Sequence, residues 1–285
     1  MRTVSNPLFA FKRVIRRPST STLPRKMNFM DPKSVYNLAN IREGLIRMED
    51  TIIFNLIERS SFYTMPSIYE KHSTKIKIPD FDGSFLDWLF QQHEVTESKV
   101  RRYQSPDEYP FYPHVIQDSF LPAINYPKLL AEYFREVNIN AEVMRIYIKE
   151  MIPRVAKQEG DEDENYGSTA SVDIFTLQSI SRRIHFGMFV AEAKFQADRE
   201  LYTELIKKRD VEGIIANITN AAVEEKILQR LLLKAKTYGT DPTLGLHGIS
   251  KVQPEVVVGI YRDWVIPLTK KVEVEYLLRR LEDDF

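Results

Sequence analysis

The stretch SVDIFTLQSISRRIHFGMFVAEAKFQ, residues 171–196, contains no proline and repeats apolar side chains every three or four positions. This spacing is typical of an α-helix that buries one face. We therefore expect one long helix over residues 171–196. The same periodicity dominates the chain from residue 31 onward and predicts an all-α fold without a significant β-sheet.

Capping and breaking residues bound the neighbouring helices. Asp31 followed by Pro32 favours a helix start, and Ser84 with Asp87 three positions later resembles a capping box. Pro267 lies inside the last helix and predicts a kink there. Besides residues 171–196, the expected helices cover about 31–59, 84–103, 139–157, 198–208, 210–218, 220–238 and 254–281.

The segments between these helices carry turn-forming residues. Prolines crowd residues 61–83 and 105–127, which predicts loops and short helices, and acidic residues 159–164 read as a solvated connection. The alternation from Thr74 to Ile78 is too short to change the fold class. A single large domain of about ten to twelve helices over residues 31–285 is the expected organisation.

The composition is that of a soluble globular protein. The 285 residues are 43% hydrophobic and 28% charged, and no apolar run is long enough to cross a bilayer. The chain has no cysteine, which excludes disulfides, thiolate metal sites and cysteine nucleophiles. This usage fits a reducing compartment, and we expect a cytoplasmic protein.

Charge is distributed unevenly along the chain. Residues 1–30 carry seven cations and no acid, whereas the other 255 residues hold 33 cations and 40 anions. The acidic body argues against nucleic acid as a partner. The basic start resembles a mitochondrial presequence, but its amphipathic pattern is weak, which favours a disordered N-terminal extension over residues 1–30 or a later start at Met27 or Met30.

Standard catalytic motifs are missing from the sequence. It contains no Walker A loop, no Gly-x-Gly-x-x-Gly, no His-Glu-x-x-His and no Gly-x-Ser-x-Gly, and its five histidines are scattered. An enzyme built from this chain would act by positioning and electrostatics rather than by covalent or metal chemistry.

Three pairs of polar residues have spacings that place both members on one helix face. These pairs are Arg183 with Lys194, Asn220 with Glu224, and Thr269 with Glu273, while Arg42 lies within the first long helix. If these faces converge, they line a cavity suited to a small dianion with hydroxyl and ether oxygens. Taken singly, each residue is more often a solvated charge, a surface pair or a helix cap than part of a binding site.

The chain resembles the fungal, regulated chorismate mutases over residues 31–283. The resemblance is carried by ordered blocks, among them NIREGLIRMED (40–50), GSFLDW (83–88), SISRRIHFG (179–187), NITNAAVEEK (217–226) and IPLTKKVEVEYLLRRL (266–281). Such enzymes rearrange chorismate to prephenate on the route to phenylalanine and tyrosine. The reaction is a pericyclic Claisen rearrangement that needs no cofactor, no metal and no covalent intermediate.

The resemblance implies a role for each of the spaced residues. Arg42 and Arg183 would hold the two substrate carboxylates, and Lys194 would donate to one carboxylate and to the ether oxygen. Glu273, in its protonated form, would donate to the same oxygen, so we expect burial to raise its pKa. The residues that would orient the ring hydroxyl and its neighbours are Asn220, Glu224 and Thr269.

The resemblance also implies a homodimer that tyrosine inhibits and tryptophan activates. The effector site would combine Arg101 and Arg102 of one subunit with residues of the other. Those residues are Asn165, Gly167, Ser168 and Ser171. The pattern departs at Glu164, where asparagine is familiar, at Ser171 and Gln253, which replace threonines, and in a longer loop at 240–253.

Two other functions stay open at this point. A non-catalytic helical protein could keep the pocket and bind chorismate, prephenate or an aromatic amino acid. A helical scaffold could instead bind anionic peptides, but it would need a broadly basic surface, whereas the body is acidic.

Overall fold

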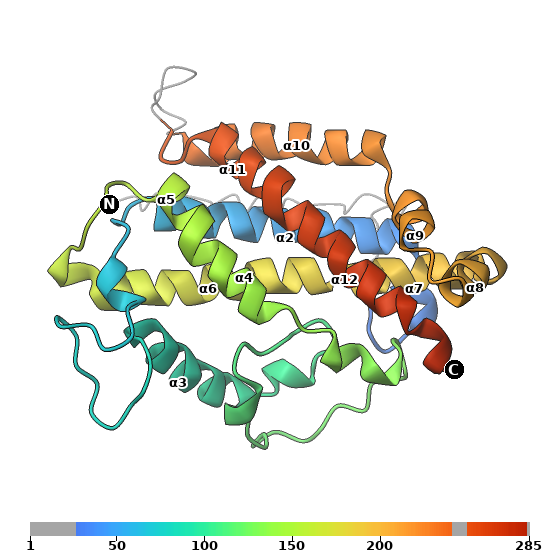
Figure 1. Ribbon diagram of the computed structural model, residues 1–285, viewed down its shortest axis with the longest axis horizontal. Coiled ribbons are helices and arrows are strands. Elements are labelled where there is room, and N and C mark those ends of the chain that lie inside the picture. Colours follow the sequence, from blue (N-terminus) through green and yellow to red (C-terminus); the bar gives the residue numbers. More distant parts are fainter. Residues whose placement is uncertain (1–26, 241–249, 284–285) are drawn as a thin grey trace, which may run out of the picture.

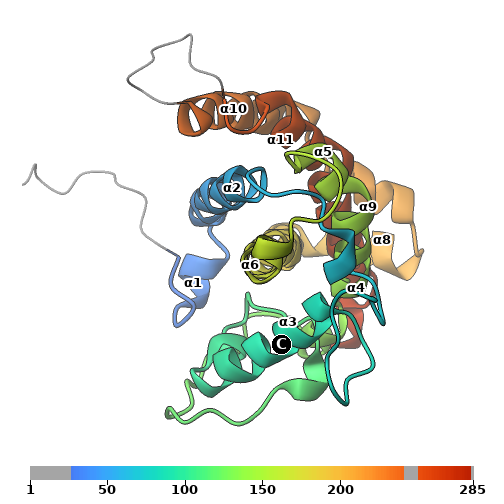
Figure 2. The same ribbon diagram turned by 90° about the vertical axis from the view of Figure 1, so that its left-hand side faces the viewer.

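The computed structural model describes residues 27–240 and 250–283, and these residues form helices and connecting segments without a strand (Figures 1 and 2). The all-α prediction is confirmed, and residues 74–78 form no strand. Most of the basic extension expected at residues 1–30 and most of the loop expected at 240–253 lie outside the described residues. Within the described part, no helix is both long and apolar enough to cross a membrane.

The helices follow the expected order. The α-helices are α1 Pro32–Val35, α2 Leu38–Arg59, α3 Phe85–Lys99, α4 Asn140–Ile146, α5 Ile152–Val155, α6 Tyr166–His185, α7 Gly187–Ala197, α8 Arg199–Lys207, α9 Val211–Ile218, α10 Ala221–Gly239, α11 Pro254–Ile260 and α12 Ile266–Leu278. Short 3₁₀ turns are η1 Pro66–Ile68, η2 Arg102–Gln104, η3 Pro113–Val115, η4 Glu132–Glu136, η6 Asp163–Asn165 and η9 Arg280–Glu282, and π-helical turns are η5 Tyr147–Met151 and η8 Tyr261–Val265.

Two long helices expected from the sequence are each divided. The first breaks before α2, where the Asn37 side chain accepts hydrogen bonds from the backbone N–H groups of Ala39 and Asn40 at 2.9 and 3.3 Å. The helix expected at 171–196 is α6, which begins earlier at Tyr166, followed by α7. The two meet at Phe186. A capping side chain explains the first break.

The interruption of the last helix precedes Pro267 rather than lying at it. The π-helical turn η8 comes directly before the Ile-Pro pair that begins α12, and η5 stands in the same relation to the Ile-Pro pair of α5, which contains Pro153. Proline lacks a backbone N–H and its ring crowds the preceding turn, and a wider turn relieves both problems. The chain therefore stays helical through both prolines.

The predicted capping box is confirmed at the start of α3. The Ser84 hydroxyl accepts a hydrogen bond from the Asp87 N–H at 3.1 Å, and the Asp87 carboxylate accepts one from the Ser84 N–H at 3.0 Å. The helix ends at Lys99, short of the expected residue 103, because Arg101 adopts a left-handed backbone conformation with φ 70°.

The site is positioned by helices that pack around α6 and α7. Figure 1 shows α12 running obliquely across this pair, and α12 contacts both α6 and α7. On the far side α2 packs against α6, and a buried ion pair of 2.8 Å between Arg59 and Asp173 joins them. Hydroxyl groups of Tyr69 and Tyr147 donate to the same carboxylate, so this buried charge is fully engaged.

Candidate active site

Glu273 lies at the meeting point of four helices. Its side chain projects from α12 and is 6% exposed. The charged groups that act on it are Lys194 of α7, Arg183 of α6, Lys270 of its own helix and Glu224 of α10. Burial raises the pKa of Glu273 to about 8, against the opposing effect of the nearby cations. The predicted direction of this pKa shift is confirmed, and the protonated carboxyl predominates at neutral pH.

Arg183 is buried at the last turn of α6, with 4% of its surface exposed. One of its terminal nitrogens donates to the Thr269 hydroxyl at 3.3 Å, and that hydroxyl donates to the Val265 carbonyl at 2.7 Å. The Nε of Arg183 is buried and has no hydrogen-bond partner among the described residues. A buried guanidinium with unused donors is poised for an anionic ligand.

Lys194 projects from the last turn of α7. Its Nζ donates to the carbonyls of Asn217 and Ile218 at 3.2 and 2.7 Å, so the end of α9 holds the ammonium in place. Burial lowers the pKa of Lys194, and the nearby Glu273 opposes that shift. A preoriented ammonium therefore faces the buried carboxyl.

The remaining predicted residues are placed less uniformly. The Asn220 side chain accepts a hydrogen bond from the Val223 N–H at 3.1 Å. Asn220 is therefore the N-cap of α10, as the helix-cap alternative predicts. Glu224 forms an ion pair of 2.8 Å with Lys270. Arg42 is exposed on α2 and has no hydrogen bond or ion pair to another described residue, so its role rests on the resemblance.

Sequence reasoning missed three residues that shape this site. Lys270 pairs with Glu224, and Tyr202 has its pKa raised first by burial and then by the nearby Glu273. A Cβ on Gly187 would come within 2.9 Å of Thr269 Cγ2 and 3.1 Å of Glu273 Cγ, so only glycine lets α12 approach α7 this closely. The spacing of Lys270 three residues before Glu273 was the one available signal.

The predicted effector residues occupy two separate places in one chain. Arg102 donates a hydrogen bond to the Glu97 carboxylate, and the same carboxylate accepts a hydrogen bond from Gln178 of α6. Ser168 lies ten residues earlier on that helix, which is about 15 Å along its axis. One subunit therefore does not bring Arg102 and Ser168 into one small-ligand site.

The other effector candidates are held by local contacts. Arg101 donates to the Pro122 carbonyl at 2.6 Å, and Asn165 donates to Glu162 at 2.7 Å. The Ser171 hydroxyl donates to the Gly167 carbonyl at 2.9 Å. Space around Gly167 is open, since a Cβ there would meet no described atom within 4 Å.

A cavity of about 850 Å³ lies away from these residues. It is lined by the start of the described chain and by α2, and it also touches Arg182 and Phe186, but none of the predicted catalytic side chains borders it. Its walls combine acids and bases without a buried convergence comparable to that around Glu273. Among the described residues, no group of three potential metal ligands is clustered.

The chain is similar to known proteins over most of its length. A family model described as chorismate mutase type II matches residues 165–274. The chain is 60% identical over 260 residues to the chorismate mutase of Pichia angusta, covering 90% of this chain and 92% of that protein. Its identity to the chorismate mutase of Saccharomyces cerevisiae is 58%, covering 90% of this chain and 100% of that protein.

Two solved structures are similar across most of the chain. The Aro7p chorismate mutase of Candida albicans, in complex with L-Trp, superposes with a TM-score of 0.88 at 56% identity, covering 91% of this chain and 97% of that one. AtCM1 with tyrosine bound in its allosteric site has a TM-score of 0.76 at 40% identity, covering 86% and 96%. With identity this high over nearly the whole length, the chain belongs to the chorismate mutase family.

Proposed function

We propose that the cluster around Glu273 is the site where this enzyme rearranges chorismate to prephenate. The observation that carries the proposal is a buried, neutral carboxyl flanked by Lys194 and Arg183. In the reaction the ether C–O bond breaks while a C–C bond forms in a single step, and no proton is transferred. The protein has only to hold the reactive conformer and meet the developing charge.

Arginine side chains would set the substrate conformation. Arg183 binds one carboxylate with the donors that its single contact to Thr269 leaves unused. Arg42, exposed on α2, closes over the second carboxylate. Two anchors of this kind place the enolpyruvyl group over the ring, which supplies much of the barrier reduction through positioning.

Charge on the ether oxygen grows as the C–O bond breaks. Lys194 donates to this oxygen and to a carboxylate, and the protonated Glu273 donates its O–H to the oxygen from the other side. Asn220, Glu224 and Thr269 orient the ring hydroxyl and its neighbours. A rate gain at the low end of the enzyme range requires about 8 kcal/mol, which positioning and two preorganised donors can supply.

The assignment is tested by measuring the rate at which chorismate absorbance is lost with purified protein. Arg183→Ala should lower kcat/KM by about 10²–10³-fold while the circular dichroism spectrum stays that of the parent, because among the described residues the buried guanidinium makes one hydrogen bond, of 3.3 Å, to Thr269. Lys208→Ala, which removes an exposed cation paired only with Glu204, is the matched control and should retain full activity. An unchanged rate for Arg183→Ala would refute the site, and chorismate binding without turnover in the parent would favour the non-catalytic binder.

We also propose a homodimer in which tyrosine inhibits and tryptophan activates. Two solved relatives were determined with tryptophan and with tyrosine, the latter in an allosteric site. On the outer faces of α2 and α6, Phe54 and Phe175 are 53% and 48% exposed, and Asn55 links their helices by donating to the Phe175 carbonyl at 3.1 Å. Exposed aromatic side chains on two adjoining helices suit contact with a second copy. We place the enzyme in the cytosol, in keeping with its lack of cysteine.

A further inference from the structure

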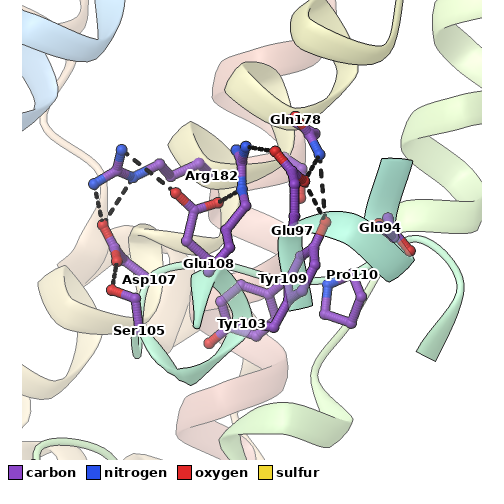
Figure 3. Close-up of polar contacts among 12 residues, drawn as sticks. Glu94, Glu97, Tyr103, Ser105, Asp107, Glu108, Tyr109, Pro110, Gln178 and Arg182 are labelled. Atoms are coloured by element: carbon purple, nitrogen blue, oxygen red, sulfur yellow. Dashed lines mark hydrogen bonds and ion pairs between the residues drawn. The ribbon is translucent and has the colours of Figure 1, made fainter. Parts of the chain in front are cut away.

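Three carboxylates from α3 and the segment after it face α6 (Figure 3). Glu97 accepts a hydrogen bond from Gln178 at 2.6 Å. Asp107, almost fully buried, accepts two from Arg182, at 2.8 and 2.5 Å. Glu108 pairs with another nitrogen of Arg182 at 3.5 Å. These contacts fasten the C-terminal half of α6 at points one helical turn apart.

Glu108 is shared between two arginines. One of its oxygens lies 3.5 Å from Arg182, and the other lies 3.2 Å from the Nε of Arg102. The backbone around it is held by Arg135, which donates to the carbonyls of Glu108 and Ser105 at 2.6 and 3.0 Å. Because the backbone is held in place, a change at one arginine alters how closely the Glu108 carboxylate pairs with the other.

Arg182 is the neighbour of Arg183 in the last turn of α6. Arg183 makes one hydrogen bond, of 3.3 Å, within the described part of the chain, so the position of its guanidinium depends on where that turn lies. The turn ends at His185, and Phe186 separates it from α7, which carries Lys194. A junction between two helices can absorb small changes of backbone angle. The contacts that hold Arg182 therefore fix the position of Arg183 relative to Lys194.

We propose that Glu108 couples Arg102 to Arg182, and that Arg182 is a positioning residue for Arg183. The inference rests on the proposed active site and, for its regulatory consequence, on the proposed effector role of Arg102. An effector carboxylate at Arg102 competes with Glu108 for the guanidinium. The released Glu108 then pairs more fully with Arg182. Because binding couplings are reciprocal, substrate at Arg183 alters effector affinity by the same factor.

A double-mutant cycle tests the coupling without any effector. Arg102→Gln, Arg182→Gln and the double variant are compared by kcat/KM in the parent and again in a Glu108→Gln background. We expect the double variant of the parent to depart from the product of the single effects by about threefold or more, and the departure to vanish once Glu108 is neutral. Additive effects in both backgrounds would overturn the proposal, and a loss of fold alone would not produce the difference between backgrounds.

Two adjacent carboxylates provide a matched pair for the regulatory consequence. Asp107 and Glu108 both form ion pairs with Arg182. Of these two carboxylates, Glu108 also forms an ion pair with Arg102, and Asp107 forms none with it among the described residues. Turnover is measured with tyrosine and with tryptophan, and effector binding by calorimetry. Asp107→Asn should change basal kinetics and keep the effector response, whereas Glu108→Gln should still bind effector but lose most of the response.

The two proposals fail in different ways. A full effector response in Glu108→Gln would overturn the coupling and leave the effector site standing. Flat effector curves for the parent would refute the effector site itself, and the double-mutant cycle would still decide whether Glu108 couples the two arginines.

Discussion

At the scale of single residues, Glu273 should set the pH dependence of the reaction. Its pKa is raised to about 8 by burial, so the carboxyl donates below that pH and ionises above it. We expect parent activity to fall as pH rises through about 8 and Glu273→Gln, whose amide donates at any pH, to stay level. Rates of chorismate loss from pH 6 to 10 measure this. A glutamine variant that declines as steeply as the parent would disprove the role.

The same carboxyl should weaken the fold as pH rises. Its folded pKa of about 8 exceeds the ordinary value of 4.5, so the folded state holds a proton that the unfolded chain releases. The stability contributed by protonated Glu273 is full below pH 4.5 and is lost as pH rises through about 8. Urea unfolding should therefore show Glu273→Gln gaining stability relative to the parent between pH 5 and pH 9, and a constant difference would contradict the buried site.

Residue spacing predicted which side chains share a face, but not which faces meet. Spacing and resemblance identify Arg183, Lys194 and Glu273 as site residues. The packing of their helices brings the three side chains around one buried point. The close approach at Gly187 depends on a neighbouring helix that spacing does not describe. Side-chain pattern is local, whereas convergence is a property of packing.

At the scale of elements, the crossing of α12 over α7 should be sensitive to one methyl group. Gly187→Ala would place a Cβ 2.9 Å from Thr269 and 3.1 Å from Glu273, so α12 must move outward. Overpacking of this kind costs about 1–3 kcal/mol. Since a displacement near 1 Å can cost about 100-fold in rate, kcat/KM should fall by about tenfold to a hundredfold.

Gly44→Ala is the control for that crossing. A Cβ at Gly44 would meet the Phe186 ring at 3.5 Å, which is an ordinary contact, and we expect activity close to the parent's. Steady-state kinetics and thermal unfolding of both variants make the comparison. If Gly187→Ala keeps parental kcat/KM, the close approach does not position the site.

Element types were predictable and element boundaries were not. Periodicity and caps identified the helical segments, and the capping box at Ser84 stands as expected. The π-helical turns before Pro153 and Pro267 were not predicted. A proline in a helical pattern indicates a kink or a break but does not indicate which type of turn accommodates it. The chain also divides at Phe186, directly before Gly187, where periodicity alone predicted one continuous helix.

At the scale of the whole molecule, the all-α class followed from periodicity, but the site for effectors did not. Composition and pattern describe one chain. In that chain Arg102 is joined through Glu97 to Gln178 of α6, and Ser168 lies about 15 Å further back along the same helix. A ligand as small as an amino acid cannot bridge that distance. The effector site therefore requires a second subunit, if both residues take part in it.

Mixed dimers test this composite site directly. One variant, Arg101→Ala with Arg102→Ala, loses the arginine half in both of its sites. The other, Asn165→Ala with Ser168→Ala, loses the opposite half, so neither homodimer should respond to tryptophan. In a dimer of one subunit of each kind, both defects fall in one site and the second site is intact. We expect the mixed dimer, purified through two different tags after coexpression, to recover tryptophan activation.

A parent dimer carrying the same two tags is the reference for that recovery. If each subunit held a complete effector site, every site of the mixed dimer would contain one defect, and activation would stay absent. Recovery therefore depends on the geometry of the assembly and not on the strength of any single contact, because both homodimers contain the same substitutions as the mixed one. A mixed dimer as unresponsive as its parents would place the effector site within one chain and contradict the assignment of Arg102 and Ser168 to opposite subunits.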